Sequence, residues 1–367
     1  MNAYFFVAPY KNCKPKQTHY QQEVIVLAEG LRHLGWRCIG NVDYWPFFNN
    51  EYLIQKASLD QFPLDVIVCS GAHFLVENKG RFDDFYTSIC NKGVPVVFTD
   101  FHDGFLTPTI AHDCSIFDLI LKGHFSNKFK VQGNAVPWTF GIPDRVADAT
   151  MRRSPFAERR NNVLWNFRIS HGLRMLADKK FRDKIEQVIP TDTKSEEKDG
   201  YAKGIPGDYL QQLNCHTGGR HNPGYFEKLI TTKACSAFGG SFTAWCYGRS
   251  FIETNLRRVN KRLPLFPKDR LYQWDSFRLW ESFAAACLTI HIDFLEEGCL
   301  FPVRPQNHVH YLGFSLTNQV CNEKNLAIMA GNATQMAEIA ESGNQFAMKH
   351  YRSTPTAERF LSLLAKI

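Results

Sequence analysis

The sequence predicts an α/β protein with two Rossmann-like domains that face each other across a cleft. At 367 residues the chain exceeds the roughly 250–300 residues at which one hydrophobic core stops growing, so two domains are expected. Short apolar runs alternate with segments of helical periodicity in both halves, as in parallel sheets built from βαβ units. A charged stretch without periodicity near residues 143–160 separates the two series and fits an interdomain linker.

The first series of elements begins with an apolar run at residues 3–8, which Pro9 ends and which suits a buried strand. A helix is expected next, with Thr18 as its capping residue and Gly35 at its C-terminal end. Further strands are expected at residues 37–42, 65–69, 94–99, 117–121 and 135–140. These elements predict a first Rossmann-like domain over residues 1–145.

The second series repeats the alternation after the linker. Its expected elements are a strand at 162–167, helices at 172–187 and 225–232, a strand at 234–238, and a helix at 276–287 that runs into a strand at 288–292. Residues 323–367 have a helical pattern, and Pro355 can begin the last helix at its first turn. The sequence therefore predicts a second Rossmann-like domain over residues 146–350 and a C-terminal helix over 351–367.

Composition and short motifs narrow the class of protein. A chain with 44% hydrophobic and 22% charged residues can bury a core, which argues against disorder. No run approaches the roughly 18 apolar residues of a membrane span, and the N-terminus lacks a signal-peptide pattern, so we expect a cytoplasmic protein without a transmembrane segment. The eleven cysteines show no CxxC spacing, which favours reduced thiols over a metal site. GxGxxG and GxxxxGKS/T motifs are absent, which disfavours dehydrogenases and P-loop nucleotidases.

The net charge of +7 favours binding to anions, and basic residues cluster between residues 249 and 270. Seven lysines or arginines stand there against Glu253 and Asp269. A solvated loop explains such a cluster without any partner, whereas Phe251 and Phe266 among the charges are typical of nucleic-acid binding. The segment motivates an alternative function, a nucleic-acid-binding or DNA-modifying protein. A peripheral contact with an anionic surface through the same segment also fits its charge.

Two motifs in the second half carry a resemblance to a known family. The segment Tyr225–Gly240 is similar to the pattern YxxxLxxSKxxxxxxG, and Asp275–Ile290 is similar to DSxRxxEAxxxGxxPV. Together they resemble the nucleotide-sugar-binding half of glycosyltransferases with two Rossmann-like domains (the GT-B fold), especially the exostosin-like group and the family 1-like C-terminal half. His308–Phe314 and the residues from 350 to 364 are similar to later elements of this group, so the resemblance spans residues 160–367.

The resemblance implies an activity and shows where this chain departs from the family. It implies a glycosyltransferase whose second half binds a nucleotide-diphosphate sugar, whose first half holds the acceptor, and whose last helix crosses back to the first domain. The acceptor classes left open are glycans, lipid-linked groups, proteins and nucleobases. Residues 286–288 replace the family's turn of small residues, Thr289 replaces its proline, and residues 241–273 form a long insertion. An inactive, sugar-binding relative is therefore a further alternative.

Arg278 and Glu281 are the main donor-binding candidates. They stand three residues apart on one helix face near its N-terminus, where backbone amides favour an anion. An arginine can form forked hydrogen bonds to a diphosphate, and a glutamate can accept hydrogen bonds from ribose hydroxyls. Gly239 and Gly240 would let the backbone approach the ligand closely, and Asp275 begins the motif. The alternative is an exposed ion pair between Arg278 and Glu281.

Further donor-binding candidates come from the segments around these motifs. His171 and Arg174 form an HxxR segment of the kind that faces the donor in the family, and a capped helix start is an equal alternative. Lys233 follows a predicted helix and can neutralise phosphate, although the dipole alone favours a lysine at a helix C-terminus. His310 and Tyr311 belong to the similar segment that comes later in the chain.

An acceptor base is expected in the first half if transfer inverts the configuration of the sugar. His102 and Asp103 follow the strand at residues 94–99, at the edge where ligands bind in parallel sheets. His19 precedes the first helix and is the third candidate. Each has a structural alternative, and a retaining mechanism needs no such base. Because arginines and helix N-termini can stabilise the leaving diphosphate, no metal and no other cofactor is expected.

Overall fold

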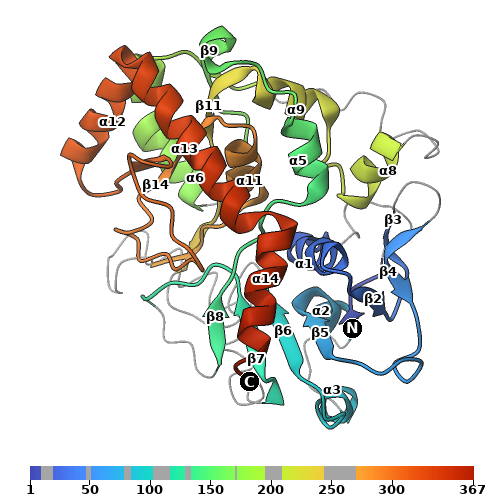
Figure 1. Ribbon diagram of the computed structural model, residues 1–367. Coiled ribbons are helices and arrows are strands. Elements are labelled where there is room, and N and C mark those ends of the chain that lie inside the picture. The colour runs from blue at the N-terminus through green and yellow to red at the C-terminus, as the bar shows by residue number, and fades with distance from the viewer. Residues whose placement is uncertain are drawn as a thin grey trace.

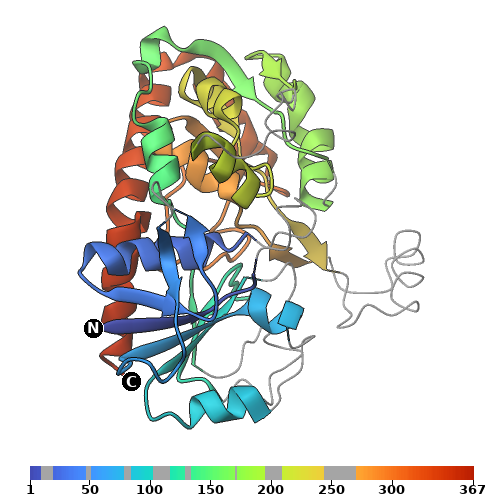
Figure 2. The ribbon, with the colours of Figure 1, turned by 90° about the vertical axis from the view of Figure 1, so that its right-hand side faces the viewer.

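The computed structural model describes residues 1–9, 20–46, 51–77, 84–101, 116–128, 134–169, 172–194, 209–243 and 270–367. These residues form an α/β structure with one large sheet in each half of the chain (Figures 1 and 2). The first sheet has eight strands and the second has five, and a separate sheet of two strands lies in the second half of the chain. The predicted alternation of strands and helices around two sheets is therefore confirmed.

The first sheet has the strand order β3-β4-β2-β1-β5-β6-β7-β8. Its strands are β1 (Asn2–Phe6), β2 (Arg37–Gly40), β3 (Tyr44–Pro46), β4 (Tyr52–Lys56), β5 (Val66–Ser70), β6 (Val96–Asp100), β7 (Leu119–Lys122) and β8 (Ala135–Pro137). Neighbouring strands run parallel, except that β3 and β4 pair antiparallel at one edge. This edge pair is absent from the sequence-based prediction.

Helices cover both faces of the first sheet, which explains why its strands are almost continuously apolar. The helices are α1 (Gln22–His33), α2 (Gly71–Glu77) and α3 (Asp84–Cys90). Leu27 and Leu31 of α1 lie in one apolar cluster, whereas Phe74 of α2 and Tyr86 of α3 lie in the other. The helical spacing predicted for α1 is confirmed, but the helix starts after Gln21, and the expected cap at Thr18 lies outside the described residues.

The second sheet has the strand order β10-β9-β11-β14-β15, and all its pairs are parallel. Its strands are β9 (Arg160–Leu164), β10 (Thr191–Asp192), β11 (Thr232–Ser236), β14 (Leu288–Ile292) and β15 (Leu312–Phe314); β12 (Ser241–Thr243) and β13 (Arg270–Gln273) form the small antiparallel sheet. The helices are α6 (Gly172–Ala177), α7 (Asp183–Glu186), α8 (Tyr209–His216), α9 (Pro223–Ile230) and α11 (Phe277–Ala284), with a π-helical turn over Asp178–Arg182.

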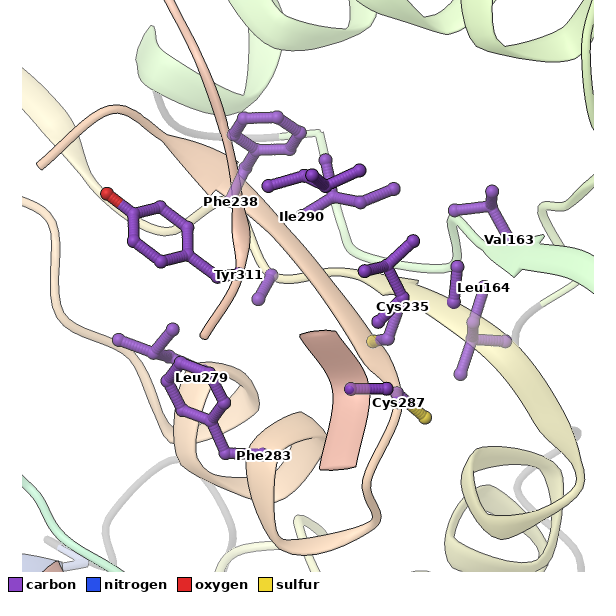
Figure 3. Packing of buried hydrophobic residues seen from close by; sticks show 14 of the residues in the cluster. Val163, Leu164, Cys235, Phe238, Leu279, Phe283, Cys287, Ile290 and Tyr311 are labelled. Carbon is purple, nitrogen blue, oxygen red and sulfur yellow. The ribbon is translucent and has the colours of Figure 1, made fainter. Parts of the chain in front are cut away.

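The core of the second half fixes the direction of α11. Figure 3 shows the cluster in which Leu279 and Phe283 of α11 pack with Leu164, Cys235 and Ile290 of the strands. All five side chains are buried. Because this apolar face of α11 is held against the sheet, the other side chains of its first turns have a defined direction as well.

The C-terminal helices connect the two halves. They are α12 (Gln319–Gly331), α13 (Ala333–Tyr351) and α14 (Ser353–Leu364), and Figures 1 and 2 show α13 and α14 running along both halves, with α14 over the first sheet. A Cβ on Gly30 of α1 would lie 1.9 Å from the carbonyl oxygen of Ser353, so α14 approaches α1 closely. Ala357 and Phe360 are buried in the core of the first half. The predicted return of the last helix to the first domain is confirmed.

The stretch at residues 143–160 contains regular structure that its sequence pattern does not reveal. Helix α5 occupies Asp144–Thr150, and a 3-10 turn occupies Phe156–Glu158. Val146 and Ala147 of α5 are buried in the core of the second half, and Arg145 is buried as well. The short helix therefore forms because tertiary packing buries one side of it, which charged neighbours in the sequence obscure.

Candidate functional site

The carboxyl ends of the two sheets meet through their loops. After β7, the Nδ1 atom of His124 accepts a hydrogen bond from the backbone N–H of Asp275, at 3.1 Å. Next to it, Lys128 and Glu297 form an ion pair at 2.9 Å, and Glu297 follows β14. Ligands of parallel α/β sheets bind at the carboxyl ends of the strands. Both halves of this protein therefore contribute to one such edge.

Gly239 and Gly240 bring the end of β11 close to the segment that precedes α11. A Cβ on Gly239 would lie 2.8 Å from the Cβ of Ser276, and one on Gly240 would lie 1.5 Å from the carbonyl oxygen of Gln273. Gly240 also has a φ of +94°, in the left-handed region that favours glycine. The close approach that these glycines allow in the structure is thus an approach of the chain to itself.

Asp275 and Ser276 hold the start of α11. The Ser276 hydroxyl accepts a hydrogen bond from the Leu279 N–H, as an N-cap residue does. One carboxyl oxygen of Asp275 accepts from the Phe140 N–H at 3.0 Å, and the other accepts from Trp280 Nε1 at 2.7 Å. Burial raises the pKa of Asp275 to about 7. Both oxygens of Asp275 are therefore engaged in joining α11 to the chain that leaves the first sheet.

Arg278 lies in the first turn of α11 and makes contacts with neutral groups. Its Nη1 atom donates to the Oδ1 atom of Asn166, just after β9, at 2.5 Å. Its guanidinium carbon lies 5.2 Å from the centre of the Tyr225 ring. Among the residues that the structure describes, Arg278 forms no ion pair. Within the described part of the chain, no carboxylate therefore contacts the positive charge of Arg278 directly.

Glu281 lies one turn further along α11 and is 5% exposed. The hydroxyl of Tyr225 donates to its Oε2 atom at 3.1 Å. Burial raises the pKa of Glu281, and the positive charges of Arg145 and Arg278 act against this rise. The exposed ion pair considered from the sequence is wrong, because Glu281 is buried and bonds to Tyr225 instead of Arg278.

The structure brings Arg174 to the same edge of the second sheet but keeps Lys233 away from it. The Nε atom of Arg174 donates to the carbonyl oxygen of Phe238, just past β11, at 2.9 Å. Lys233 belongs to β11, so the predicted position at a helix C-terminus is wrong. Its ammonium lies 6.0 Å from the ring centre of Phe156, which precedes β9. Lys233 is thus near the amino end of the sheet, opposite to Arg174.

His310 and Tyr311 take part in packing contacts in the structure. The His310 ring stacks on Phe346 of α13 at 4.3 Å between ring centres. Tyr311 is 1% exposed, and its hydroxyl accepts from the Phe294 N–H at 3.0 Å. Four predicted residues lie outside the described residues: His19, His102, Asp103 and His171. The basic segment at residues 249–270 lies outside them too, apart from Arg270 at the start of β13.

Three buried charged residues near this edge are absent from the sequence-based site. Lys122 and Asp100 form an ion pair at 3.1 Å at the carboxyl ends of β7 and β6, and both side chains are buried. A charged residue directly after an apolar strand was the available signal for this pair. Arg145 of α5 is 4% exposed and bonds to the Tyr20 hydroxyl at 2.6 Å. No periodic pattern surrounds Arg145, so only the tertiary structure reveals it.

The described part of the chain contains no group of three or more His, Cys, Asp or Glu residues that could hold a metal ion. Within the same part of the chain, no helix combines the length and the apolar character that crossing a membrane requires.

Comparisons with known proteins find similarity in structure but not in sequence. No protein-family model and no curated protein matches the chain. Among solved structures, the chain is similar to an α-glucosyltransferase in complex with UDP and a 13-mer DNA containing a central A:G mismatch. The identity is 10%, the match covers 100% of both chains, and the TM-score is 0.53. This likeness shows the fold, so the chain has the two-domain architecture of GT-B glycosyltransferases.

Two further matches have lower TM-scores. A glycosyltransferase from Rickettsia africae matches with 9% identity over 100% of this chain and 98% of its own, with a TM-score of 0.47. HepE from Anabaena, in complex with UDP and glucose, matches with 10% identity over 100% of this chain and 99% of its own, with a TM-score of 0.46.

Proposed function

We propose that this protein is a glycosyltransferase that binds a nucleotide-diphosphate sugar in its second half and transfers the sugar to an acceptor held by its first half. The observation that carries the proposal is the pair Arg278 and Glu281 on the first turns of α11. The arginine has neutral contacts and the glutamate is buried against Tyr225, at the carboxyl edge of a parallel sheet. The GT-B architecture and the exostosin-like motifs support the same assignment.

The chemistry follows from where these groups would contact the donor. Arg278 would donate to the diphosphate, and Glu281 would accept from the ribose hydroxyls. In transfer, the bond between the sugar C1 and the diphosphate oxygen breaks, and a bond from C1 to the acceptor oxygen forms. The diphosphate leaves with the electron pair, and guanidinium groups stabilise its charge. We therefore propose a reaction that needs no divalent metal and no other cofactor.

The acceptor side of the proposal rests on the first sheet. Its loop after β7 contacts the start of α11, and the candidates His102 and Asp103 follow β6, the neighbour of β7. If transfer inverts the configuration at the sugar C1, then His102, Asp103 or His19 would take the proton from the acceptor hydroxyl. Lys233 is not carried into this proposal, because it lies near the other end of β11.

Among the possible acceptors, a nucleobase in DNA is the one that specific observations favour. The observations that favour it are the net charge of +7, the basic residues between 249 and 270, and the similarity to an α-glucosyltransferase whose structure contains DNA. Incubation with duplex DNA and radiolabelled UDP-glucose would place label in the DNA if this candidate is correct. Absence of label in the DNA, with nucleotide binding intact, would leave glycans, lipid-linked groups and proteins as the acceptor classes.

Calorimetry with UDP, ADP and GDP tests donor binding directly. We expect the parent protein to bind one of these nucleotides. Arg278→Ala should lower the affinity for that nucleotide about ten- to a hundredfold, because a charge-assisted hydrogen bond is lost. Glu281→Gln should lower the affinity for the nucleotide more than the affinity for inorganic pyrophosphate, because pyrophosphate has no ribose. Arg160→Ala, an exposed arginine at the start of β9, is the matched control and should bind as the parent does. Parent-like binding by both folded site variants would refute the assigned site.

A further inference from the structure

Arg145 of α5 is a buried guanidinium whose contacts all involve neutral groups. It is 4% exposed. Its Nη2 and Nε atoms donate to the Tyr20 hydroxyl at 2.6 Å and 3.0 Å, and Nη2 lies 3.3 Å from the Oε1 atom of Gln22. Its Nη1 atom lies 3.1 Å from Nδ1 of His221. Within the described residues, Arg145 forms no ion pair.

The partners of Arg145 stay uncharged. Because Arg145 can only donate, Nδ1 of His221 must accept, which requires the neutral imidazole with its proton on Nε2. Burial and the charge of Arg145 together lower the pKa of His221 to about 3. Burial also raises the pKa of Tyr20 above its ordinary value. The hydrogen-bond partners of Arg145 are thus all neutral groups.

A buried charge without a counter-charge is costly, and folded proteins usually pair it. On the second half, Arg145 acts on Glu281, because its charge is the strongest of those that lower the pKa of this carboxyl. On the first half, burial raises the pKa of Glu29 of α1, and the charge of Arg145 acts against this rise. Arg278 acts on the Glu281 carboxyl as well. Arg145 and Arg278 therefore both act on one buried carboxylate, that of Glu281, without a direct ion pair to it within the described residues, and two guanidinium groups can donate to a diphosphate.

The geometry places Arg145 next to the first turn of α11. The Tyr20 ring lies 5.2 Å from the guanidinium carbon of Arg145 and 5.1 Å from the ring of Phe277, the first residue of α11. Helix α5 also packs against both α9 and α11. Arg145 therefore approaches the Arg278 and Glu281 site from the side of the first half of the chain.

We propose that Arg145 is a further donor-binding residue, which donates to the diphosphate of the nucleotide held by Arg278 and Glu281. This inference rests on the proposed function. Because Tyr20 and Gln22 of the first half hold the same guanidinium, donor binding in the second half also restrains the first half. Arg145 lies outside both sequence motifs, so neither motif assigns it this role.

The test is calorimetry on the full chain with UDP, inorganic pyrophosphate and uridine as probes. Arg145→Met should lower the affinities for UDP and pyrophosphate about ten- to a hundredfold, because their phosphates lose a charged hydrogen-bond donor. The affinity for uridine, which has no phosphate, should fall by less than about threefold. Arg145→Lys keeps the positive charge but lacks the planar pair of N–H donors of a guanidinium, so it should lower the affinity for UDP by about five- to tenfold. This milder variant serves as the readout if Arg145→Met does not fold, as judged by circular dichroism.

Ser353→Ala is the matched control for an effect transmitted through the interface. It removes a hydroxyl that lies 2.9 Å from Oε2 of Glu29 and 3.1 Å from Oδ1 of Asp144 and leaves the contacts of Arg145 in place, so UDP affinity should stay within about threefold of the parent. A loss as large as that of Arg145→Met would overturn the proposal in favour of an interface role. Parent-like UDP binding by Arg145→Met and Arg145→Lys, with Arg278→Ala impaired, would overturn it while leaving the proposed function intact. Absence of UDP, ADP and GDP binding to the parent would remove the proposed function and this inference together.

Discussion

Replacing Gly240 by alanine should destabilise the second half strongly, because two separate costs act at this position. Gly240 has a φ of +94°, and a Cβ there would lie 1.5 Å from the carbonyl oxygen of Gln273 and 2.3 Å from its carbonyl carbon. A flexible side chain could move away from a new methyl group, but the atoms met here belong to the backbone. The segment from Gln273 to the start of α11 must therefore shift.

Gly35→Ala is the matched control, because it has the cost of a left-handed backbone without the cost of a steric clash. Gly35 has a φ of +81°, and a Cβ there would meet no atom within 4 Å. Gly35→Ala should cost only the left-handed backbone term, about 1–2 kcal/mol. Gly240→Ala adds the overpacking term of about 1–3 kcal/mol, so its total should be roughly 2–5 kcal/mol. Both variants change the unfolded chain in the same way, so this contribution cancels in the comparison.

Urea unfolding followed by tryptophan fluorescence measures both variants. We expect the midpoint to fall for each, and to fall clearly further for Gly240→Ala. Because the displaced segment carries the cap of α11, nucleotide affinity should also decrease in Gly240→Ala and not in Gly35→Ala. Equal midpoints for the two variants would show that the contact with Gln273 is not rigid, and would refute the reasoning.

Three further predictions concern stability and metal dependence. Ala286 has a φ of +49°, in the left-handed region that favours glycine, so Ala286→Gly should raise the free energy of unfolding by about 0.5–1 kcal/mol, measured by urea unfolding; a lower midpoint would contradict this. Burial, together with nearby Asp144, raises the pKa of Glu29 from 4.5 to about 8, so the folded protein should lose stability as pH rises through this window. Glu29→Gln should flatten that loss between pH 5 and pH 9 in urea titrations, and an unchanged slope would count against it. Nucleotide binding measured by calorimetry should persist in EDTA, because guanidinium groups neutralise the diphosphate in the proposed site; loss on chelation that manganese restores would contradict that site.

The order of strands and helices was largely predictable because apolar periodicity is local. Residues 3–8 and 94–99 read as buried strands, and both contain strands of the first sheet. The edge strand β3 was missed since it has three residues and includes Trp45, with a φ of 63°, and Pro46. Helix α5 was missed because its buried face is short and charged residues surround it. Elements of this length depend on their tertiary neighbours.

The site was predictable in part, for the same reason. A spacing of three residues puts Arg278 and Glu281 on one helix face, and the motif assigned the helix. The surroundings of the pair come from Asn166, Tyr225 and Arg145, which are far away in the sequence. No local pattern could therefore distinguish a buried pair from an exposed one.

The sequence by itself determined the two α/β halves, the helix that carries Arg278 and Glu281, and the positive net charge, since all three follow from residue type and local spacing. Only the tertiary structure decided which charges meet. It placed Lys233 near the opposite end of β11, engaged Asp275 with Phe140 of the preceding half, and brought Arg145 beside α11. These outcomes depend on how two sheets and a connecting helix pack together, and that packing is a sum of many weak contacts between residues distant in the chain.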